Sequence, residues 1–176
     1  MIQGEKVRLR AMNETDIETV CTWENDSSLW ESSAAMAPYT AEEIASLLTT
    51  ADPDDFAENG QLRFIIELTD GGEAIGTIDL TDYTAAGRRA AVGILIYKEC
   101  FRRQGYASQA LKLVIDHASG ELGLHQLYAY MPSDNRGSIA LFTSAGFAEC
   151  GLLRDWVRAD GGRWKDAVMT QLIFSN

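Results

Sequence analysis

The chain has 176 residues, 46% of them apolar, which is enough for a single domain with a sizeable core. Its 15 Lys and Arg against 26 Asp and Glu give a formal net charge of −11, which disfavours binding to nucleic acids and anionic membranes. No apolar run is long enough to span a membrane, and the charged start MIQGEKVRLRAMNE is unlike a signal peptide. We therefore expect a cytoplasmic protein with one domain over residues 1–176.

The first half of the chain predicts strands and short helices. Asn13 is a helix cap candidate, and Thr40 followed by Glu43 is the pattern of a capping box. The turn TDGGE between two apolar stretches predicts a hairpin. In chain order the elements are a strand at 6–12, helices within 14–26 and 39–48, and strands at 62–68 and 74–80.

The second half predicts a central strand and an amphipathic helix. The long apolar run at 88–98 is typical of a strand buried on both faces. From Ala107 to Ala118, apolar residues recur at helical spacing, which predicts a helix over about 106–117. A strand at 124–131, a helix at 135–145 capped by Gly146 and a hairpin of 151–157 with 166–174 follow. The fold class expected is α/β, with a mixed, mostly antiparallel sheet and helices on both faces.

The stretch FRRQGYASQAL, residues 101–111, carries the densest local positive charge of the chain. It opens the amphipathic helix, where unpaired N–H groups and the helix dipole favour an anion. The pattern Arg-x-x-Gly-x-Ala, with small residues at 105 and 107, lets that anion approach the backbone. We interpret the stretch as a pyrophosphate site, and the alternative is a plain strand-to-helix turn with solvated arginines.

Two motifs, in this order, resemble the GCN5-related N-acetyltransferase (GNAT) superfamily. The first is RRQGYA after the central strand, and the second is Asn-x-x-Ser-x-x-Leu-aromatic-x-x-x-Gly-Phe from Asn135 to Phe147. The segments TWEND and DGGRWKDAVM further resemble the branch of ribosomal-protein N-acetyltransferases and spermidine acetyltransferases. The resemblance covers nearly the whole chain. It implies splayed central strands and direct transfer of an acetyl group from acetyl-CoA to a primary amine, without a metal.

The resemblance also implies a donor site by position. A strand edge would pair with the pantetheine arm, the start of the helix would hold the pyrophosphate, and the later motif would lie beside the pantetheine and the thiol. These residues are, respectively, Leu95, Ile96 and Tyr97; Arg102, Arg103, Gln104, Gly105, Tyr106, Ala107 and Ser108; and Asn135, Ser138 and Phe142.

Two catalytic residues common in the family are missing from their usual places. Many members use a tyrosine as the acid, and its position here is Phe142, which has no proton to donate. Many carry a glutamate on the central strand, and none lies within 88–98. Ser138 or a water could protonate the thiolate, the thiolate could leave unaided, or the protein could bind acyl-CoA without turnover. We favour an enzyme with Ser138 as the acid; a hydroxyl that only touches the donor is the other interpretation of Ser138.

The acceptor expected is a small cationic, polyamine-like molecule or a protein amino-terminus. The charge of −11 favours a cation, and candidate contacts near the first helices are Glu24, Asp26, Glu31 and Tyr39. Polyamine acetyltransferases of this branch carry acidic residues before a Pro-Tyr pair, whereas Met36 and Ala37 stand there in this chain. The alternative from another class is an acyl-CoA-binding sensor. Family members are often dimers, so a homodimer is one possible assembly.

Three further side chains are of types that occur in functional sites, but no motif surrounds them in the sequence. His117 and His125 have no partner at the spacing of metal ligands, which predicts surface or capping roles. Cys100 lies near the predicted anion site, and we interpret it as a small buried hydrophobe. The three cysteines of the chain are far apart and lack CxxC spacing, which fits a reducing compartment better than disulfides or zinc.

Overall fold

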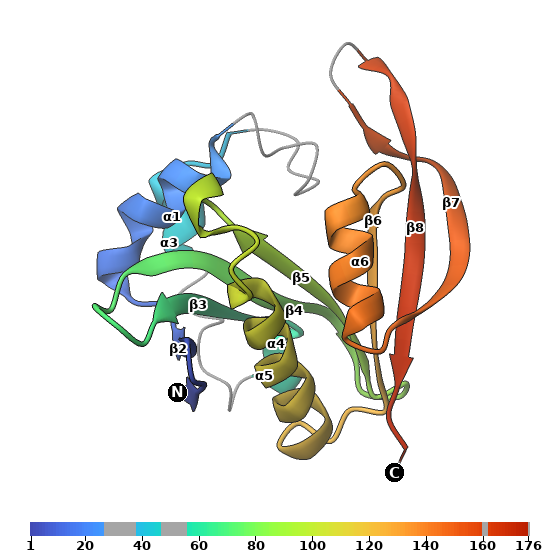
Figure 1. Ribbon diagram of the computed structural model, residues 1–176, viewed down its shortest axis with the longest axis horizontal. Helices are drawn as coiled ribbons and strands as arrows, with labels where there is room; N and C mark the ends of the chain where they lie inside the picture. The colour runs from blue at the N-terminus through green and yellow to red at the C-terminus, as the bar shows by residue number, and fades with distance from the viewer. Residues whose placement is uncertain (27–37, 47–55, 160–161, 176) are drawn as a thin grey trace.

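The architecture is a twisted sheet with helices packed on both faces (Figure 1). The computed structural model describes residues 1–26, 38–46, 56–159 and 162–175. Within these ranges the sheet has eight strands in the order β1-β2-β3-β4-β5-β6-β8-β7, and every pair is antiparallel except β5 with β6. The strands are β1 Ile2–Gln3, β2 Val7–Ala11, β3 Leu62–Leu68, β4 Ala74–Thr84, β5 Arg89–Ile96, β6 Gln126–Pro132, β7 Ala148–Arg158 and β8 Trp164–Ile173. The predicted fold class is confirmed.

The helices divide between two hydrophobic clusters. Phe64 and Ile66 of β3 belong to the cluster that contains the apolar stripe of α5, whereas Ile65 belongs to the cluster beneath α1 and α3. Since neighbouring strand residues point to opposite faces, α5 and α1 cover opposite faces of the sheet. The helices are η1 Glu14–Asp16, α1 Ile17–Glu24, α3 Ala41–Ser46, α4 Phe56–Asn59, η5 Glu99–Phe101, α5 Tyr106–Gly120 and α6 Arg136–Ser144.

The predicted helix caps are present. The Asn13 side chain accepts a hydrogen bond from the N–H of Thr15, and Asp16 bonds back to the N–H of Asn13. Thr40 and Glu43 form the reciprocal pair of a capping box, at 2.7 and 3.1 Å. Gly146 follows α6 with φ of +96°, the left-handed conformation that suits a residue without a Cβ. These local signals therefore set where the helices begin and end.

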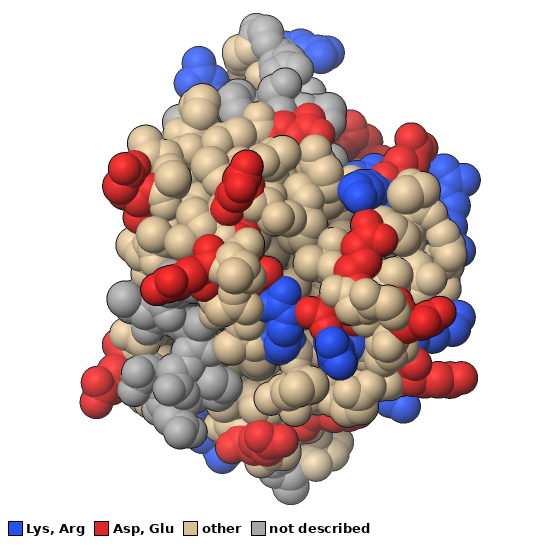
Figure 2. Space-filling model, turned by 90° about the vertical axis from the view of Figure 1, so that its left-hand side faces the viewer, with Lys and Arg blue, Asp and Glu red and all other residues tan. Residues whose placement is uncertain are grey.

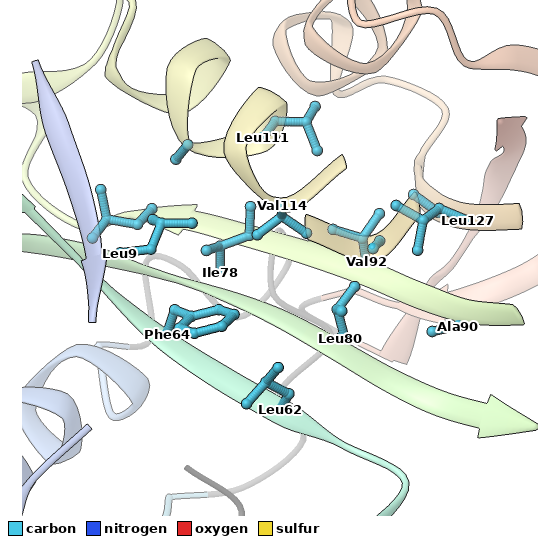
Figure 3. Packing of buried hydrophobic residues seen from close by; sticks show 14 of the residues in the cluster. Leu9, Leu62, Phe64, Ile78, Leu80, Ala90, Val92, Leu111, Val114 and Leu127 are labelled. Atoms are coloured by element: carbon cyan, nitrogen blue, oxygen red, sulfur yellow. The ribbon is translucent and has the colours of Figure 1, made fainter. Parts of the chain in front are cut away.

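The central packing joins α5 to the middle strands of the sheet (Figure 3). In Figure 3, Val114 points from the helix toward Ile78 and Val92, and these three residues are buried together with Leu9 and Leu111 in one cluster. Removing a side chain of this size from water contributes about 1.5–3 kcal/mol. A polar clamp adds to this contact, because the Gln109 side-chain oxygen accepts hydrogen bonds from the N–H groups of Lys6 and Val7, at 2.6 and 2.8 Å. The start of α5 is thereby held against the beginning of β2.

The central strand departs from its prediction at its far end. Ala90, Ala91 and Val92 are buried, but Gly93 is exposed and Ile94 is only half-buried. The reason is that β5 pairs with β6 through only three residues, of which the last, Ala91, faces Tyr128. Beyond that point the two strands diverge, as Figure 1 shows. The expected splay of the central strands is thus present.

Two predictions about single side chains were wrong. His117 is 6% exposed and its ring meets the edge of Phe64 at 5.8 Å, because the turn of α5 that carries it faces β3. Cys100 is exposed, because it lies in η5 outside the sheet. Helical periodicity assigns a residue to the less apolar side of a helix, but it does not show how far the neighbouring strand reaches around that helix.

An ion-pair network joins β2, β3 and the first helical turn. Arg10 donates to both oxygens of Asp16, each at 2.7 Å, and also to Glu67, which Arg8 contacts as well. Burial is the largest single effect and raises the pKa values of Asp16 and Glu67, but the hydrogen bonds and positive charge of Arg10, together with the N–H of Asn13 on Asp16 and with Arg8 on Glu67, outweigh it and lower both pKa values. Figure 2 views the side of the molecule on which α1 and α3 lie, where basic groups near the middle of the face touch acidic ones.

The first prediction concerns this network. Arg10→Gln leaves two largely buried carboxylates with fewer donors, and we expect a loss of about 2 kcal/mol in the free energy of unfolding at neutral pH. Because the folded-state pKa values are lowered, the contribution is present above the ordinary carboxylate range near pH ~4 and is lost as the pH falls below it. Urea unfolding between neutral and acidic pH measures both effects.

The control is Lys98→Gln, which breaks the exposed ion pair of Lys98 with Glu73 and should leave unfolding unchanged. Equal stability of Arg10→Gln and the parent protein would show that the network does not hold the fold.

Candidate active site

The gap between the separated ends of β5 and β6 is a cleft of about 750 Å³. Its walls come from both faces of the sheet: the start of α5 and α6 on one side, and α1, β3 and β4 on the other. The cleft therefore passes through the sheet at the point where the strands part.

The exposed edge of β5 turns alternate backbone groups into this cleft. The N–H of Tyr97 donates to the C=O of Ile75 of β4 at 3.0 Å, so the backbone groups of Tyr97 and of every second residue before it point toward β4. The other set faces β6, since the C=O of Arg88 accepts from the N–H of Gln126 at 3.3 Å. Ile94 and Ile96 belong to this second set and lie beyond the last β6 pair. The N–H and C=O of Ile94 and the N–H of Ile96 are available to an extended ligand lying along the strand, whereas the C=O of Ile96 accepts a hydrogen bond from Arg102.

The start of α5 offers unpaired N–H groups to the same cleft. Gly105 precedes the helix with φ of +86°, a conformation that glycine adopts without strain, and no side chain caps the helix. Within the described residues no acceptor bonds the N–H groups of Tyr106, Ala107 and Ser108. Among the residues that the structure describes, a Cβ at Gly105 would have the Lys6 ammonium alone within 4 Å, at 3.7 Å. This geometry suits a phosphate group.

The positive charge at this helix start has different sources from those expected. Arg102 lines the cleft, but its guanidinium donates to the C=O groups of Ile96 and Tyr97, both at 3.1 Å, and braces the end of β5. Arg103 lines the cleft with a backbone φ of +59°. The Lys6 ammonium donates to the C=O of Gln104 at 3.3 Å. No pattern in the sequence points to Lys6, because the packing of α5 on β2 brings it there from a distant part of the chain.

On α6, the later motif supplies a cap and the floor of the cleft. The Asn135 side chain accepts from the N–H of Ser138 at 3.1 Å, which orients the start of the helix. Ser138 is half-buried and lines the cleft. Phe142 also lines it, with an exposure of 2% and its ring edge-on to Phe147 at 5.1 Å. The ring of Phe142 thus has a packing role at this position, although it carries no hydroxyl group.

An acidic cluster lies on the opposite side of the sheet. Arg63 of β3 donates to both oxygens of Asp79 on β4, at 2.7 and 3.1 Å, and to Glu24 of α1 at 3.1 Å. All three line the cleft, and with one guanidinium between two carboxylates the cluster has a formal charge of −1. Burial raises the pKa of Glu24, and the attraction of Arg63 offsets only part of that effect. Glu24 is therefore more basic than an exposed glutamate.

The position of Asp79 beside the central strand was not expected from the sequence. Asp79 pairs with Gly93 of β5 in the sheet register, and no atom of the described residues lies within 4 Å of where a Cβ of Gly93 would be. The central strand itself thus lacks a carboxylate, but the neighbouring strand holds one beside an open position. The signal available in the sequence was a charged residue within the predicted strand 74–80, but its partner on β5 is known only from the register of the sheet.

The other predicted residues divide between the cleft and its surroundings. Leu95 lines the cleft, and so does Tyr39, whose backbone is held by the Asn25 side chain at 2.7 and 2.8 Å. Glu31 lies outside the described residues. Three predicted donor residues and one acceptor residue do not line the cleft: Tyr97, Gln104, Tyr106 and Asp26. Tyr97 instead stacks on Trp23, with ring centroids 5.5 Å apart.

Comparisons with known proteins identify the class of protein that this cleft defines. A family model described as an acetyltransferase (GNAT) domain matches residues 6–148. An uncharacterized N-acetyltransferase, p20, from Bacillus licheniformis is 28% identical, over 96% of this chain and 93% of that protein. The chain belongs to the GNAT acetyltransferase family. It is an N-acetyltransferase, and acetyl-CoA is its acetyl donor.

Solved structures agree with this fold. Spermidine N-acetyltransferase from Vibrio cholerae, in complex with CoA and spermine, matches with a TM-score of 0.83 and 22% identity, over 97% of this chain and 96% of that one. RimJ from Mycobacterium smegmatis, in complex with CoA-disulfide, matches with a TM-score of 0.80 and 24% identity, over 95% and 81%. In the part of this chain that the structure describes, no helix is both long and apolar enough to cross a membrane.

Proposed function

We propose that this N-acetyltransferase acts on a primary amine of a small cationic molecule or of a protein amino-terminus, which enters the cleft beside Glu24 and Asp79. The observation that carries the proposal is the passage through the sheet. On one face, unpaired N–H groups at the start of α5 suit the anionic end of acetyl-CoA. On the other face, a cluster with a charge of −1 suits an ammonium group. The donor side and the acceptor side of the cleft meet at Gly93 and Ile94, which line it.

The similarity to two kinds of acetyltransferase supports both acceptor classes. One similar structure is a spermidine N-acetyltransferase that contains spermine, and another is RimJ. Because each shares less than a quarter of its residues with this chain, neither selects the acceptor. The acidic wall is compatible with both classes, since each presents a positively charged amine to the enzyme.

For the donor, we propose that the pyrophosphate of acetyl-CoA lies on residues 102–108 and that Lys6 neutralises part of its charge. Free N–H groups, a glycine and an ammonium group converge there. The pantetheine arm would pair with the backbone of Ile94 and Ile96, and Asn135 would offer its side-chain N–H₂ because its oxygen caps α6. Among the predicted edge residues, Ile96 is the one whose backbone has this direction.

A prediction for the donor site follows. Gly105→Val places a branched side chain at a backbone position with φ of +86°, directly where the anion would lie. We expect acetyl-CoA binding, measured by calorimetry, to weaken by a factor of about 100, since several phosphate contacts are lost.

The control for this variant is Gly151→Ala on β7, where no atom lies within 4 Å of the added Cβ and φ is not positive. It should bind acetyl-CoA like the parent protein. If Gly105→Val binds acetyl-CoA as tightly as the parent protein, the pyrophosphate does not lie on this loop.

The proposed reaction is a direct transfer. The neutral amine attacks the thioester carbonyl carbon, the C–N bond forms and the C–S bond breaks. Glu24 accepts the proton that the ammonium loses, because its raised pKa makes it a better base than an exposed glutamate. Arg63 and Asp79 hold Glu24 in place. Ser138 gives its proton to the departing thiolate and takes up the proton that the nitrogen loses as the amide forms, so its hydroxyl group is restored. The backbone N–H of Ile94 lies on the edge where the oxyanion develops.

The function is tested by measuring thiol release from acetyl-CoA with polyamines, simple primary amines, amino acids and short peptides. We expect release that depends on the acceptor and a product acetylated at a primary amine, identified by mass spectrometry. Tight binding of acetyl-CoA with no thiol release for any acceptor would instead favour a sensor that binds acyl-CoA without turnover.

The acid–base assignment predicts two different pH profiles. Glu24→Gln should lower kcat by about 100-fold and abolish the loss of rate on the acidic side, since a protonated Glu24 cannot accept a proton. Burial raises the pKa of Glu24, so this loss in the parent enzyme begins closer to neutral pH than for an exposed glutamate.

Ser138→Ala should lower kcat by about 10-fold and keep the acidic limb where it is, because the hydroxyl acts on the leaving group. Thermal unfolding of both variants shows whether they are folded. An unchanged rate for Ser138→Ala at saturating substrates would leave Ser138 as a hydroxyl that only touches the donor, and an unchanged acidic limb in Glu24→Gln would assign the base elsewhere.

A further inference from the structure

Two large aromatic side chains stand exposed and in contact with each other on β6 and β7, and one of them, Tyr130, lines the cleft. Tyr130 lines the cleft and is 40% exposed, and Trp156 is 52% exposed. Their rings meet edge to face, with centroids 5.9 Å apart and an interplanar angle of 83°. Val157, beside Trp156, is buried and also lines the cleft. An apolar surface of this kind, open to water at the rim of a cleft, is typical of a binding site.

The sheet register places this aromatic pair on the same face as the acidic cluster. Asp79 pairs with Gly93, Thr81 pairs with Ala91, and Ala91 in turn pairs with Tyr128. Residues two apart on one strand share a face, so Tyr130 lies on the face of Asp79, across the gap between β5 and β6. A molecule bound through its amine at the acidic wall would therefore extend toward the aromatic wall.

An irregularity in β7 aims Trp156 at Tyr130. Leu153 pairs with Ala167 and Val157 pairs with Lys165, so three residues of β7 lie opposite Asp166 alone. The middle one, Asp155, has φ of +49°, and its N–H is held by the Asp166 carboxylate at 3.0 Å. A left-handed conformation of a residue other than glycine costs free energy, and such conformations cluster at functional sites. The free-energy cost of the Asp155 conformation is consistent with a Trp156 side chain that is positioned for a ligand.

We propose that Tyr130 and Trp156 form a subsite for an uncharged, apolar or aromatic group that the acceptor carries next to its primary amine. This inference rests on the proposed function, and it narrows the acceptor to amphipathic amines. The charges beside Trp156 do not favour a second cation. Arg154 and Arg158 flank Trp156 in the sequence, are exposed, and offset the negative charges of Asp155 and Asp166. The Lys165 ammonium is already paired with Asp134, at 2.9 Å.

The test compares matched acceptors in the thiol-release assay at saturating acetyl-CoA. 2-Phenylethylamine and 1,4-diaminobutane are similar in length, but one carries a ring and the other a second ammonium group. Tripeptides that begin with Phe or with Lys make the same comparison for an amino-terminus and distinguish a peptide from a free amine. We expect kcat/KM to be at least about 10-fold higher for the aromatic member of the preferred pair.

The variant Trp156→Ala should raise KM for the aromatic acceptor about 10-fold, with kcat and the KM for 1,4-diaminobutane nearly unchanged. The matched control is Leu152→Ala, on the same strand and 51% exposed, which is not part of the aromatic pair and should behave like the parent enzyme. Because both side chains are about half exposed, neither change should affect folding, which a thermal unfolding curve verifies.

The outcomes separate this inference from the proposed function. No thiol release with any amine by the parent enzyme would overturn the proposed function. Release that is as fast or faster with 1,4-diaminobutane and the Lys peptide would leave the function in place and overturn the aromatic subsite. An equal loss for both acceptors in Trp156→Ala would also overturn it, because a subsite for the apolar group affects only the acceptor that carries one.

Discussion

The loss of pairing between β5 and β6 after three residues is the constraint on which the active site depends. In a continuous sheet, the backbone groups of Ile94 and Ile96 would bond a neighbouring strand and the side chains around Gly93 would close over them. Because the strands part, an unsatisfied strand edge opens into a cleft that crosses the sheet. Unpaired backbone groups are costly when buried, so this edge is best satisfied by a ligand. The cleft is therefore both a departure from regular structure and the place where an extended donor can bind.

The two faces of the sheet have different chemistry because of what packs on each. On the α5 face, the helix is held to β2 by Gln109, and this contact brings Lys6 to the helix start, where N–H groups are unpaired. On the α1 face, β3 and β4 hold a guanidinium between two carboxylates. A donor with a negatively charged tail and an acceptor with a positively charged amine would thus approach from opposite sides. Their reacting ends would meet where Gly93 leaves room.

The absence of the usual catalytic side chains on β5 and α6 is compatible with an active enzyme. Phe142 fills its position by packing against Phe147, and its place in the cleft is apolar. A carboxylate that is missing from the central strand is available one strand away and on the neighbouring helix, as Asp79 and Glu24. Since proton transfer requires only a group of suitable pKa within reach, its position in the chain can change while the geometry of the reaction is kept. The family membership and the site are consistent on this point.

The sequence by itself determined the features that depend on neighbouring residues. The caps at Asn13, Thr40 and Gly146, the stripe of α5 and the order of strands and helices follow from local hydrogen bonding and periodicity. The family motifs also located the start of α5 and of α6 at the cleft. Only the tertiary structure decided which distant residues meet. Lys6, Arg63, Asp79 and the Tyr130–Trp156 pair reach the cleft through strand register and helix docking, and His117 is buried for the same reason. Contacts of this kind join residues far apart in the chain, so no local pattern records them.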